Sequence, residues 1–411
     1  MVKASLKKVF IKNFKSLHDC EIDIGKLNVV VGANASGKSN LVEAFRLLKK
    51  IYADKDSFPF LEWWGYNNVV WQRKEELSIT IGLLFNIEGY DVYFEIVCTG
   101  AGGKFQILRE VLDVRGYVRF EKEGELNIII HNPDFIDDFI KNPLKYEAST
   151  KARAKLKKLK SQLTKEIGYE VDLEKKLLEY SFINLSVGDD FTEKKTGKRF
   201  ILSNFPPSIW SSQISKKPEE ITVLCPAIYY EGEFEDSNIA SVYHTIYLKE
   251  GKIPEQIYNP LTMVFPKIDV RPHLTDDGRV MIKFLEDGFD LLPPNTSDGF
   301  YKILTLLTAI YLNPPLLIID EIENSLHPST LELILDTIKI GDTQTIITTH
   351  SPVVVDMTDL SNIVLVEKEQ GESKFKRIKD PEKIKEFLIE KGITFSEGWI
   401  YGDLFKTEQQ A

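Results

Sequence analysis

The stretch Gly32-Ala33-Asn34-Ala35-Ser36-Gly37-Lys38-Ser39 has the composition and spacing of a phosphate-binding loop. The apolar run Leu27-Asn28-Val29-Val30-Val31 precedes it and predicts a buried strand. This strand, followed by the loop and then by a helix, distinguishes a phosphate loop from a chance glycine-rich turn. The helix is predicted by apolar residues that repeat on one face: Leu41, Ala44, Phe45 and Leu48.

In such a loop, backbone N–H groups and the N-terminus of the following helix bind phosphate oxygens. Lys38 is expected to reach the β- and γ-phosphates, and the Ser39 hydroxyl is expected to bind Mg²⁺. The sequence therefore predicts that the chain binds a nucleoside triphosphate. The expected nucleotide-binding residues are Gly32, Asn34, Ala35, Ser36, Gly37, Lys38, Ser39 and Asn40.

A second apolar run, Leu316-Leu317-Ile318-Ile319, ends in Asp320-Glu321. Such a run is typical of a parallel strand that is covered on both faces. A carboxylate at its carboxyl end points into the crevice where open α/β sheets bind ligands. We expect Asp320 to hold Mg²⁺ and Glu321 to polarise the attacking water in phosphoryl transfer. A solvated strand end is the alternative, and the upstream phosphate loop argues against it.

The run Thr345-Ile346-Ile347-Thr348-Thr349 predicts a third strand, which ends at His350. A helix between the second and third strands would complete a βαβ unit. His350 would then emerge at the same sheet edge as Asp320, where an imidazole can bind the γ-phosphate. The apolar residues that predict this helix are Leu331, Ile334, Leu335 and Ile338.

Together with Glu323-Asn324-Ser325-Leu326-His327-Pro328 and Thr349-His350-Ser351-Pro352, these motifs resemble an ABC-type ATPase head. The branch is that of SMC, RecF and overcoming-lysogenisation-defect (OLD) ATPases. The opening Val9–Leu17 and the close Phe395–Gly402 are also similar to that group. The resemblance implies an α/β head with a mostly parallel sheet flanked by helices, an antiparallel β-subdomain and a helical insertion. It also implies ATP hydrolysis, with ATP and Mg²⁺ as cofactors.

Members of that group act as dimers that sandwich ATP, and each head offers a signature segment to the γ-phosphate of the other. The candidate segment is Thr296-Ser297-Asp298-Gly299-Phe300, with Ser297 and Gly299 at the start of a predicted helix. It contains one glycine and departs from the Leu-Ser-Gly-Gly-Gln of transporters. Ser-Asp-Gly is also an ordinary turn and helix cap.

The same resemblance places other residues near the nucleotide or the second head. Lys15 and Ser16 are carried over as nucleotide contacts. Asn324 and Ser325 are expected in a loop that meets the partner head. His327 and the following proline are expected to shape that loop rather than to do chemistry.

The chain is predicted to have three parts. Residues 1–130 would form an N-terminal ATPase lobe, because alternating segments from 76 to 114 indicate an antiparallel sheet. Residues 131–220 would form a helical insertion with a short hairpin arm, where SMC-type relatives insert coiled coils. Residues 221–411 would form the C-terminal ATPase lobe.

Two clusters permit alternative interpretations. Basic residues between Lys151 and Lys165 could mark a nucleic-acid footprint or a solvated helix face. An aromatic loop could be buried or could form a partner interface. It contains Phe58, Phe60, Trp63, Trp64, Tyr66 and Trp71.

The composition of the chain argues against several other classes of protein. The chain has 411 residues, a net charge of −10 and three cysteines, so it predicts neither general attraction to nucleic acid nor a disulfide framework. No signal peptide or membrane helix is expected, which predicts a cytoplasmic protein without a membrane partner. The segment after His350 is too short for the Toprim nuclease that many OLD relatives carry, because a domain usually needs ~100 residues.

The resemblance to the SMC, RecF and OLD group implies an ATP-gated dimerisation switch, the ATPase or sensor component of a defence or nucleic-acid-processing system. A separate effector protein would then supply any cutting activity. Two alternatives remain: a DNA-binding repair or chromosome-maintenance ATPase of RecF or SMC type, and an ATP-stabilised oligomeric scaffold with slow hydrolysis.

Overall fold

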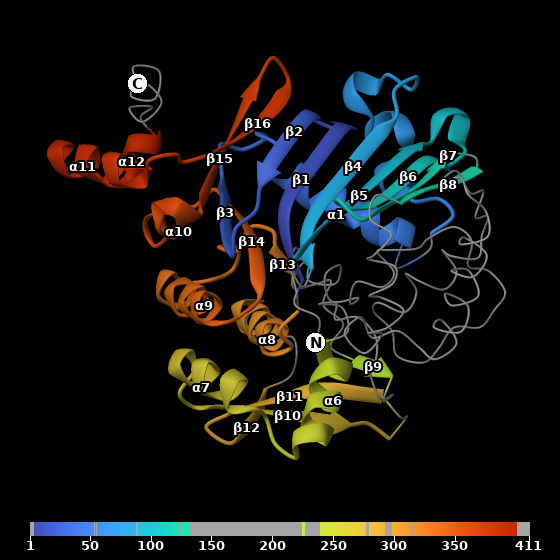
Figure 1. Cartoon of the computed structure of the whole chain (residues 1–411). Coiled ribbons are helices and arrows are strands. Elements are labelled where there is room, and N and C mark those ends of the chain that lie inside the picture. Colours follow the sequence, from blue (N-terminus) through green and yellow to red (C-terminus); the bar gives the residue numbers. More distant parts are fainter. Residues whose placement is uncertain are drawn as a thin grey trace. The chain divides into compact units, whose positions relative to one another are not determined.

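The computed structural model describes residues 4–52, 54, 56–87, 89–123, 125–130, 224–226, 239–276, 279–291, 298–314 and 316–400 (Figure 1). They cluster into two compact units, each drawn from segments that are distant in the sequence. The predicted helical insertion with its basic cluster lies outside the described residues, and so does Ser297. The three-part division of the chain stays a prediction. The first unit takes the described residues of Met1–Ile24, Glu43–Pro207 and Lys368–Lys374, and the second those of Gly25–Val42, Ser208–Glu367 and Phe375–Ala411.

The first unit is built on a seven-stranded antiparallel sheet with the order β2-β1-β4-β5-β6-β7-β8. Along β5, buried residues alternate with partly exposed ones, as expected for a sheet with one face in the core. The predicted antiparallel sheet is confirmed. Its strands are β1 (Ala4–Phe14), β2 (Leu17–Asp23), β4 (Ile79–Ile87), β5 (Tyr90–Thr99), β6 (Gln106–Val114), β7 (Val118–Glu123) and β8 (Glu125–Ile130).

The aromatic loop of this unit divides between core and surface. Phe60 packs edge-on against Tyr66 at 5.0 Å between ring centroids, and both are buried. Trp71 is also buried and stacks on a histidine of β2. Phe58 and Trp64 are instead 65% and 90% exposed. Burial, one of the two predicted alternatives, therefore applies to part of the loop only.

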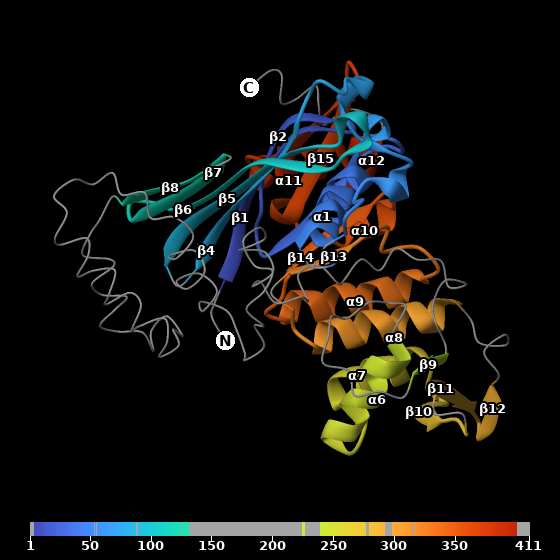
Figure 2. The same cartoon turned by 90° about the vertical axis from the view of Figure 1, so that its right-hand side faces the viewer.

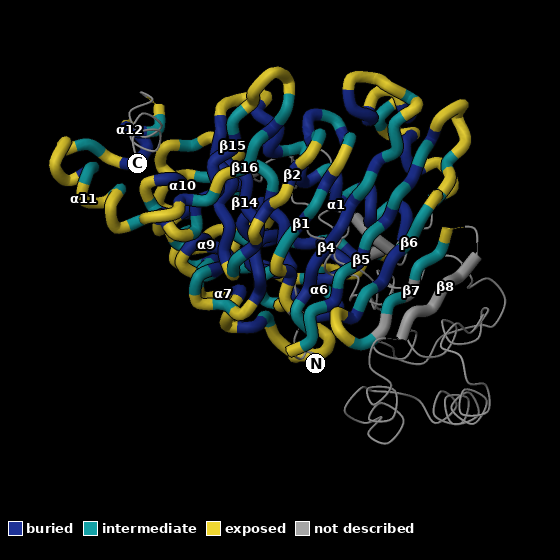
Figure 3. Tube along the Cα trace, turned by 45° about the horizontal axis from the view of Figure 1, so that its top comes forward, coloured by how far each residue is buried: buried dark blue, intermediate teal, exposed yellow. Residues whose placement is uncertain are grey.

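The second unit contains a five-stranded sheet with the order β13-β14-β3-β15-β16, in which β13, β14, β3 and β15 pair in parallel. Every residue of β3, β13 and β14 is buried, and β14 is dark along its length in Figure 3. Both faces of these strands are therefore covered. The parallel pairing confirms the predicted mostly parallel sheet. The strands are β3 (Leu27–Val31), β13 (Leu316–Ile319), β14 (Gln344–Thr349), β15 (Ile363–Glu369) and β16 (Glu372–Arg377).

Helices follow the strands where the apolar spacing predicted them. The helix between β13 and β14 begins at a proline, and His327 caps it by accepting a hydrogen bond from the Ser329 N–H group. His327 thus shapes the loop, as expected. The helices are α1 (Lys38–Tyr52), α8 (Asp298–Tyr311), α9 (Pro328–Ile340), α10 (Pro352–Asp356), α11 (Pro381–Lys391) and α12 (Phe395–Ile400).

Among its described residues, the second unit also contains a smaller four-stranded sheet and the helices α6 and α7 (Figure 2). Phe284 of this sheet meets Phe300 of α8 at 4.4 Å between ring centroids, so one apolar core joins both sheets. No described helix combines the length and apolar character needed to cross a membrane. The elements are β9 (Leu224–Pro226), α6 (Ile239–Glu250), α7 (Glu255–Val264), β10 (Ile268–Leu274), β11 (Arg279–Glu286) and β12 (Phe289–Leu291).

The position of β14 between β13 and β3 predicts that its side chains carry much of the stability of the second unit. Ile347 is fully buried, whereas Ile340 at the end of α9 is 85% exposed. We expect Ile347→Ala to lower the free energy of unfolding by about 2–5 kcal/mol, because it leaves a cavity, and Ile340→Ala to change it little. Urea denaturation of both variants measures the difference. Equal urea midpoints for the two variants would contradict the expected contribution of β14 to the stability of the second unit.

Candidate active site

The strand register brings the predicted site residues to one edge of the parallel sheet. Ile319 of β13 pairs with Ile347 of β14, and Thr349 of β14 pairs with Val31 of β3. Asp320, the first residue after β13, therefore lies beside the end of β14. The phosphate loop, which follows β3, begins beside the same end of β14. Carboxyl ends of parallel strands form the ligand-binding edge of open α/β sheets.

The phosphate loop requires glycine at two positions for different reasons. At Gly32, a Cβ atom would lie 2.4 Å from the Val366 carbonyl oxygen and 2.6 Å from the Ser36 hydroxyl oxygen. At Gly37, just before α1, φ is +109°, a conformation that disfavours side chains. The loop thus brings backbone close to β15 and then turns directly into the N-terminus of α1, the arrangement that binds phosphate in such loops.

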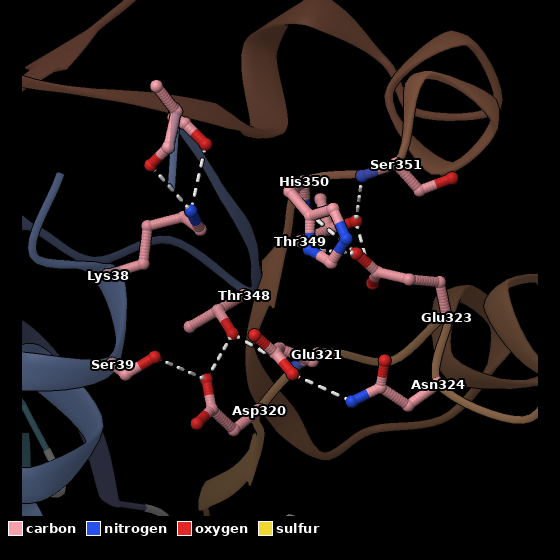
Figure 4. Close-up of polar contacts among 12 residues, drawn as sticks. Lys38, Ser39, Asp320, Glu321, Glu323, Asn324, Thr348, Thr349, His350 and Ser351 are labelled. Atoms are coloured by element: carbon pink, nitrogen blue, oxygen red, sulfur yellow. Dashed lines mark hydrogen bonds and ion pairs between the residues drawn. The ribbon is translucent and has the colours of Figure 1, made fainter. Parts of the chain in front are cut away.

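Lys38 folds back over this loop. Its ammonium nitrogen donates hydrogen bonds to the carbonyl oxygens of Gly32 and Ala33, at 2.8 and 3.0 Å (Figure 4). Burial lowers the pKa of Lys38, while the carboxylates of Glu321, Glu323 and Asp320 act in the opposite direction. A partly desolvated cation that is held at a phosphate cradle is suited to bind a polyanion.

Asp320 lies where the phosphate loop and the second motif meet. Its Oδ1 atom is 3.4 Å from the Ser39 hydroxyl oxygen and also accepts a hydrogen bond from the Thr348 hydroxyl (Figure 4). Ser39 and Asp320 thus offer two oxygen ligands, the kind that Mg²⁺ prefers. These residues therefore fit the expected metal.

Thr348 is a site residue that the sequence analysis missed. It is fully buried in β14, and besides donating to Asp320 its hydroxyl accepts a hydrogen bond from the Glu321 N–H group at 2.9 Å. One hydroxyl therefore fixes both residues of the Asp-Glu pair. The strand register, which a single sequence does not reveal, is the signal that would have identified it.

Glu321 has an unusual backbone conformation. Its φ is +50°, which costs a non-glycine residue of the order of 1–3 kcal/mol and is retained where the surroundings impose it. The bond to Thr348 is one restraint. The Asn324 side-chain amide is another, because it donates to Glu321 Oε2 at 2.7 Å. Asn324 was predicted to meet a partner head, which stays a prediction; within its own chain it orients Glu321.

His350 is held by Glu323, to which the sequence analysis assigned no role. Glu323 Oε1 accepts from the His350 backbone N–H group at 2.8 Å and lies 3.0 Å from His350 Nδ1. Its Oε2 atom accepts from the Thr349 hydroxyl at 2.8 Å. The loop after β13 therefore contacts the end of β14 at Thr348, Thr349 and His350.

Gly299, the described glycine of the predicted signature, lies in the first turn of α8. A Cβ atom there would approach the Ser325 carbonyl oxygen to 2.6 Å. The close approach of α8 to the loop after β13 is therefore a structural reason for glycine, separate from any role toward phosphate.

Lys15 and Ser16, carried over as nucleotide contacts, belong to the first unit. The Lys15 ammonium pairs with Glu43 and lies 5.5 Å from the centroid of the Trp63 ring. Ser16 is buried, and its hydroxyl oxygen lies 2.6 Å from that of Ser373. Their contact with nucleotide stays a prediction.

Thr348 offers a direct test of this arrangement. Thr348→Val keeps the side-chain shape but leaves the Glu321 N–H group without its partner, so we expect a loss of about 1–3 kcal/mol in the free energy of unfolding. Thr348→Ser keeps the hydroxyl and should preserve more of that stability. Chemical denaturation compares the two. A valine variant as stable as wild type would mean that the hydroxyl does not fix the Asp-Glu pair.

Comparison with protein families gives two matches. Residues 5–230, more than half of the chain, match the family described as "AAA ATPase domain". Residues 228–356 match the family described as "AAA domain, putative AbiEii toxin, Type IV TA system". The second match includes Asp320, Glu321 and His350.

Individual relatives and solved structures share less than a third of their residues with this chain where they align. The chain is 27% identical over 115 residues to an OLD nuclease of Thermus scotoductus, which covers 28% of this chain and only 21% of that protein. It is 23% identical over 384 residues to the DNA replication and repair protein RecF of Picosynechococcus, covering 84% of this chain and 90% of that protein. An SMC head crystallised with the C-terminal winged-helix domain of ScpA aligns with a TM-score of 0.49 and 16% identity, over 93% of this chain and 99% of the head.

The family match extends from the first strand through the phosphate loop, and the second match contains the Asp-Glu pair that this loop faces. The chain therefore belongs to the AAA ATPase domain family and is an ATPase, and its sequence is similar to RecF and OLD proteins, as its motifs predicted.

Proposed function

We propose that the protein is a Mg²⁺-dependent ATP hydrolase in which ATP gates the closure of two copies. The observation that supports this most directly is the bracing of Asp320 and Glu321 by Thr348, at the edge where Ser39 ends the phosphate loop. Phosphoryl transfer depends mainly on positioning and electrostatic stabilisation, and this edge supplies fixed groups for both.

Each group has a proposed role. Lys38 and the loop N–H groups bind the β- and γ-phosphates of ATP. Ser39 and Asp320 would hold Mg²⁺, which neutralises phosphate charge when bound. Glu321 orients the attacking water by accepting a hydrogen bond from it, and His350 contacts the γ-phosphate.

Closure of two copies would complete the site. Gly299 lies against the Ser325 carbonyl oxygen, so the described start of α8 adjoins the loop after β13. Asn324 and Ser325 are exposed there. We propose that this surface meets the phosphates bound by the other copy, with Ser297 and Gly299 as anion ligands.

The proposed biological role is the ATPase or sensor component of a cytoplasmic defence system with a separate effector. Residues 228–356 match a family description that names a toxin of a type IV TA system, and another segment resembles an OLD nuclease. These two similarities support a defence role.

A second candidate function is DNA repair or chromosome maintenance. The similarity to RecF spans 84% of this chain and 90% of that protein, whose name states a role in DNA replication and repair. In this alternative the ATP-bound dimer itself binds DNA.

Glu321→Gln tests the switch. The amide still accepts a hydrogen bond but cannot act as an anionic base, so we expect slow hydrolysis and an ATP-trapped dimer. Light scattering with and without Mg-ATP should show a doubling of mass for this variant. The exposed Glu332→Gln is the matched control, and adding Lys38→Ala to Glu321→Gln should abolish the shift. A mass that ATP leaves unchanged would overturn the gated dimer.

The DNA alternative has a separate test. If the dimer binds DNA, the Glu321→Gln variant with Mg-ATP should raise the fluorescence anisotropy of a labelled duplex. The affinity for DNA should fall steeply between about 50 and 200 mM salt. The double variant Lys38→Ala/Glu321→Gln should bind more weakly. If ATP does not increase DNA binding even at low salt, the DNA-binding alternative is excluded.

A further inference from the structure

Glu323 receives three polar contacts from two consecutive residues at the end of β14. The Thr349 hydroxyl and the His350 N–H group each donate to its carboxylate at 2.8 Å, and His350 Nδ1 lies 3.0 Å from Oε1 (Figure 4). The Glu323 side chain is only 11% exposed, whereas that of His350 is 43% exposed. The carboxylate is therefore the enclosed partner, and the imidazole remains accessible.

The contact between Glu323 and His350 Nδ1 restrains the imidazole ring in addition to the loop. The contacts with the Thr349 hydroxyl and the His350 N–H group would by themselves fix the loop after β13 to β14. The contact with Nδ1 fixes the ring as well. An ionised carboxylate only accepts hydrogen bonds, so a neutral imidazole that uses this 3.0 Å approach for a hydrogen bond carries its proton on Nδ1. Nε2 is then left for a ligand, and no described residue bonds it.

We propose that Glu323 is a positioning residue for hydrolysis, which holds His350 in the orientation and protonation pattern that directs Nε2 to the γ-phosphate. This inference rests on the γ-phosphate contact proposed above for His350. Partners of this kind set the tautomer and direction of a histidine that acts on a ligand.

The position of Glu323 also links the two catalytic groups. Asn324, the next residue, bonds the Glu321 carboxylate. Two consecutive residues therefore hold the water-polarising carboxylate and the phosphate-contacting imidazole. A second copy that docks on the exposed side of this loop would adjust both groups together.

The wild-type protein provides the first test. In protein labelled with ¹⁵N-histidine, long-range ¹H–¹⁵N spectra show which ring nitrogen carries a proton, and His350→Gln identifies the signal among six histidines. We expect a proton on Nδ1 of His350 at neutral pH. A ring protonated at Nε2 alone would overturn the proposal.

Kinetics provides the second test. Glu323→Leu should lower kcat about 10- to 100-fold, the usual effect of removing such a partner, while ATP affinity stays within about two-fold. Glu323→Gln keeps an acceptor for both His350 donors and should retain most activity, even if the leucine variant does not fold. Glu332→Leu, on the exposed face of α9, is the control.

A double-mutant cycle shows whether Glu323 acts through His350. In the His350→Ala background, Glu323→Leu should cause no further loss, and an additive loss would overturn the proposal. Normal turnover of His350→Ala would overturn the role proposed for His350. Normal turnover of Glu323→Leu beside an impaired His350→Ala would overturn only the positioning role.

Discussion

The parallel register of β13, β14 and β3 is the constraint on which the site depends. Pairing of Ile319 with Ile347 places Asp320 beside Thr348, and pairing of Thr349 with Val31 starts the phosphate loop at the same edge. A slip by one residue would move every side chain to the opposite face. Because all three strands are buried on both faces, such a slip would disrupt the core as well as the site.

The site contains several groups that are unfavourable when considered alone. Lys38 is buried, Glu321 has a positive φ, and Glu323 is an almost enclosed carboxylate. Each is compensated locally: loop carbonyl oxygens hold Lys38, Thr348 and Asn324 hold Glu321, and the end of β14 holds Glu323. Such preorganisation places charges before the substrate arrives, which is the main source of catalysis in phosphoryl transfer.

The loop between β13 and α9 connects this chemistry to the surface. It begins at Asp320, passes the restraints on Glu321 and His350, and ends at the His327 cap of α9. Its Ser325 carbonyl lies against Gly299 of α8. One short segment therefore adjoins the proposed Mg²⁺ ligand, the two proposed catalytic groups and the described glycine of the predicted signature.

The sequence by itself determined the phosphate loop, the Asp-Glu strand end, the crossover helix and the antiparallel sheet, because these depend on local spacing and side-chain periodicity. It did not reveal Thr348 or Glu323, and it left the aromatic loop undecided between core and surface. Those features depend on strand register and on contacts between residues that are far apart in the chain. Only the tertiary structure decided that one threonine hydroxyl fixes the Asp-Glu pair and that the Glu323 carboxylate contacts His350, because hydrogen-bond geometry exists only after the strands have paired.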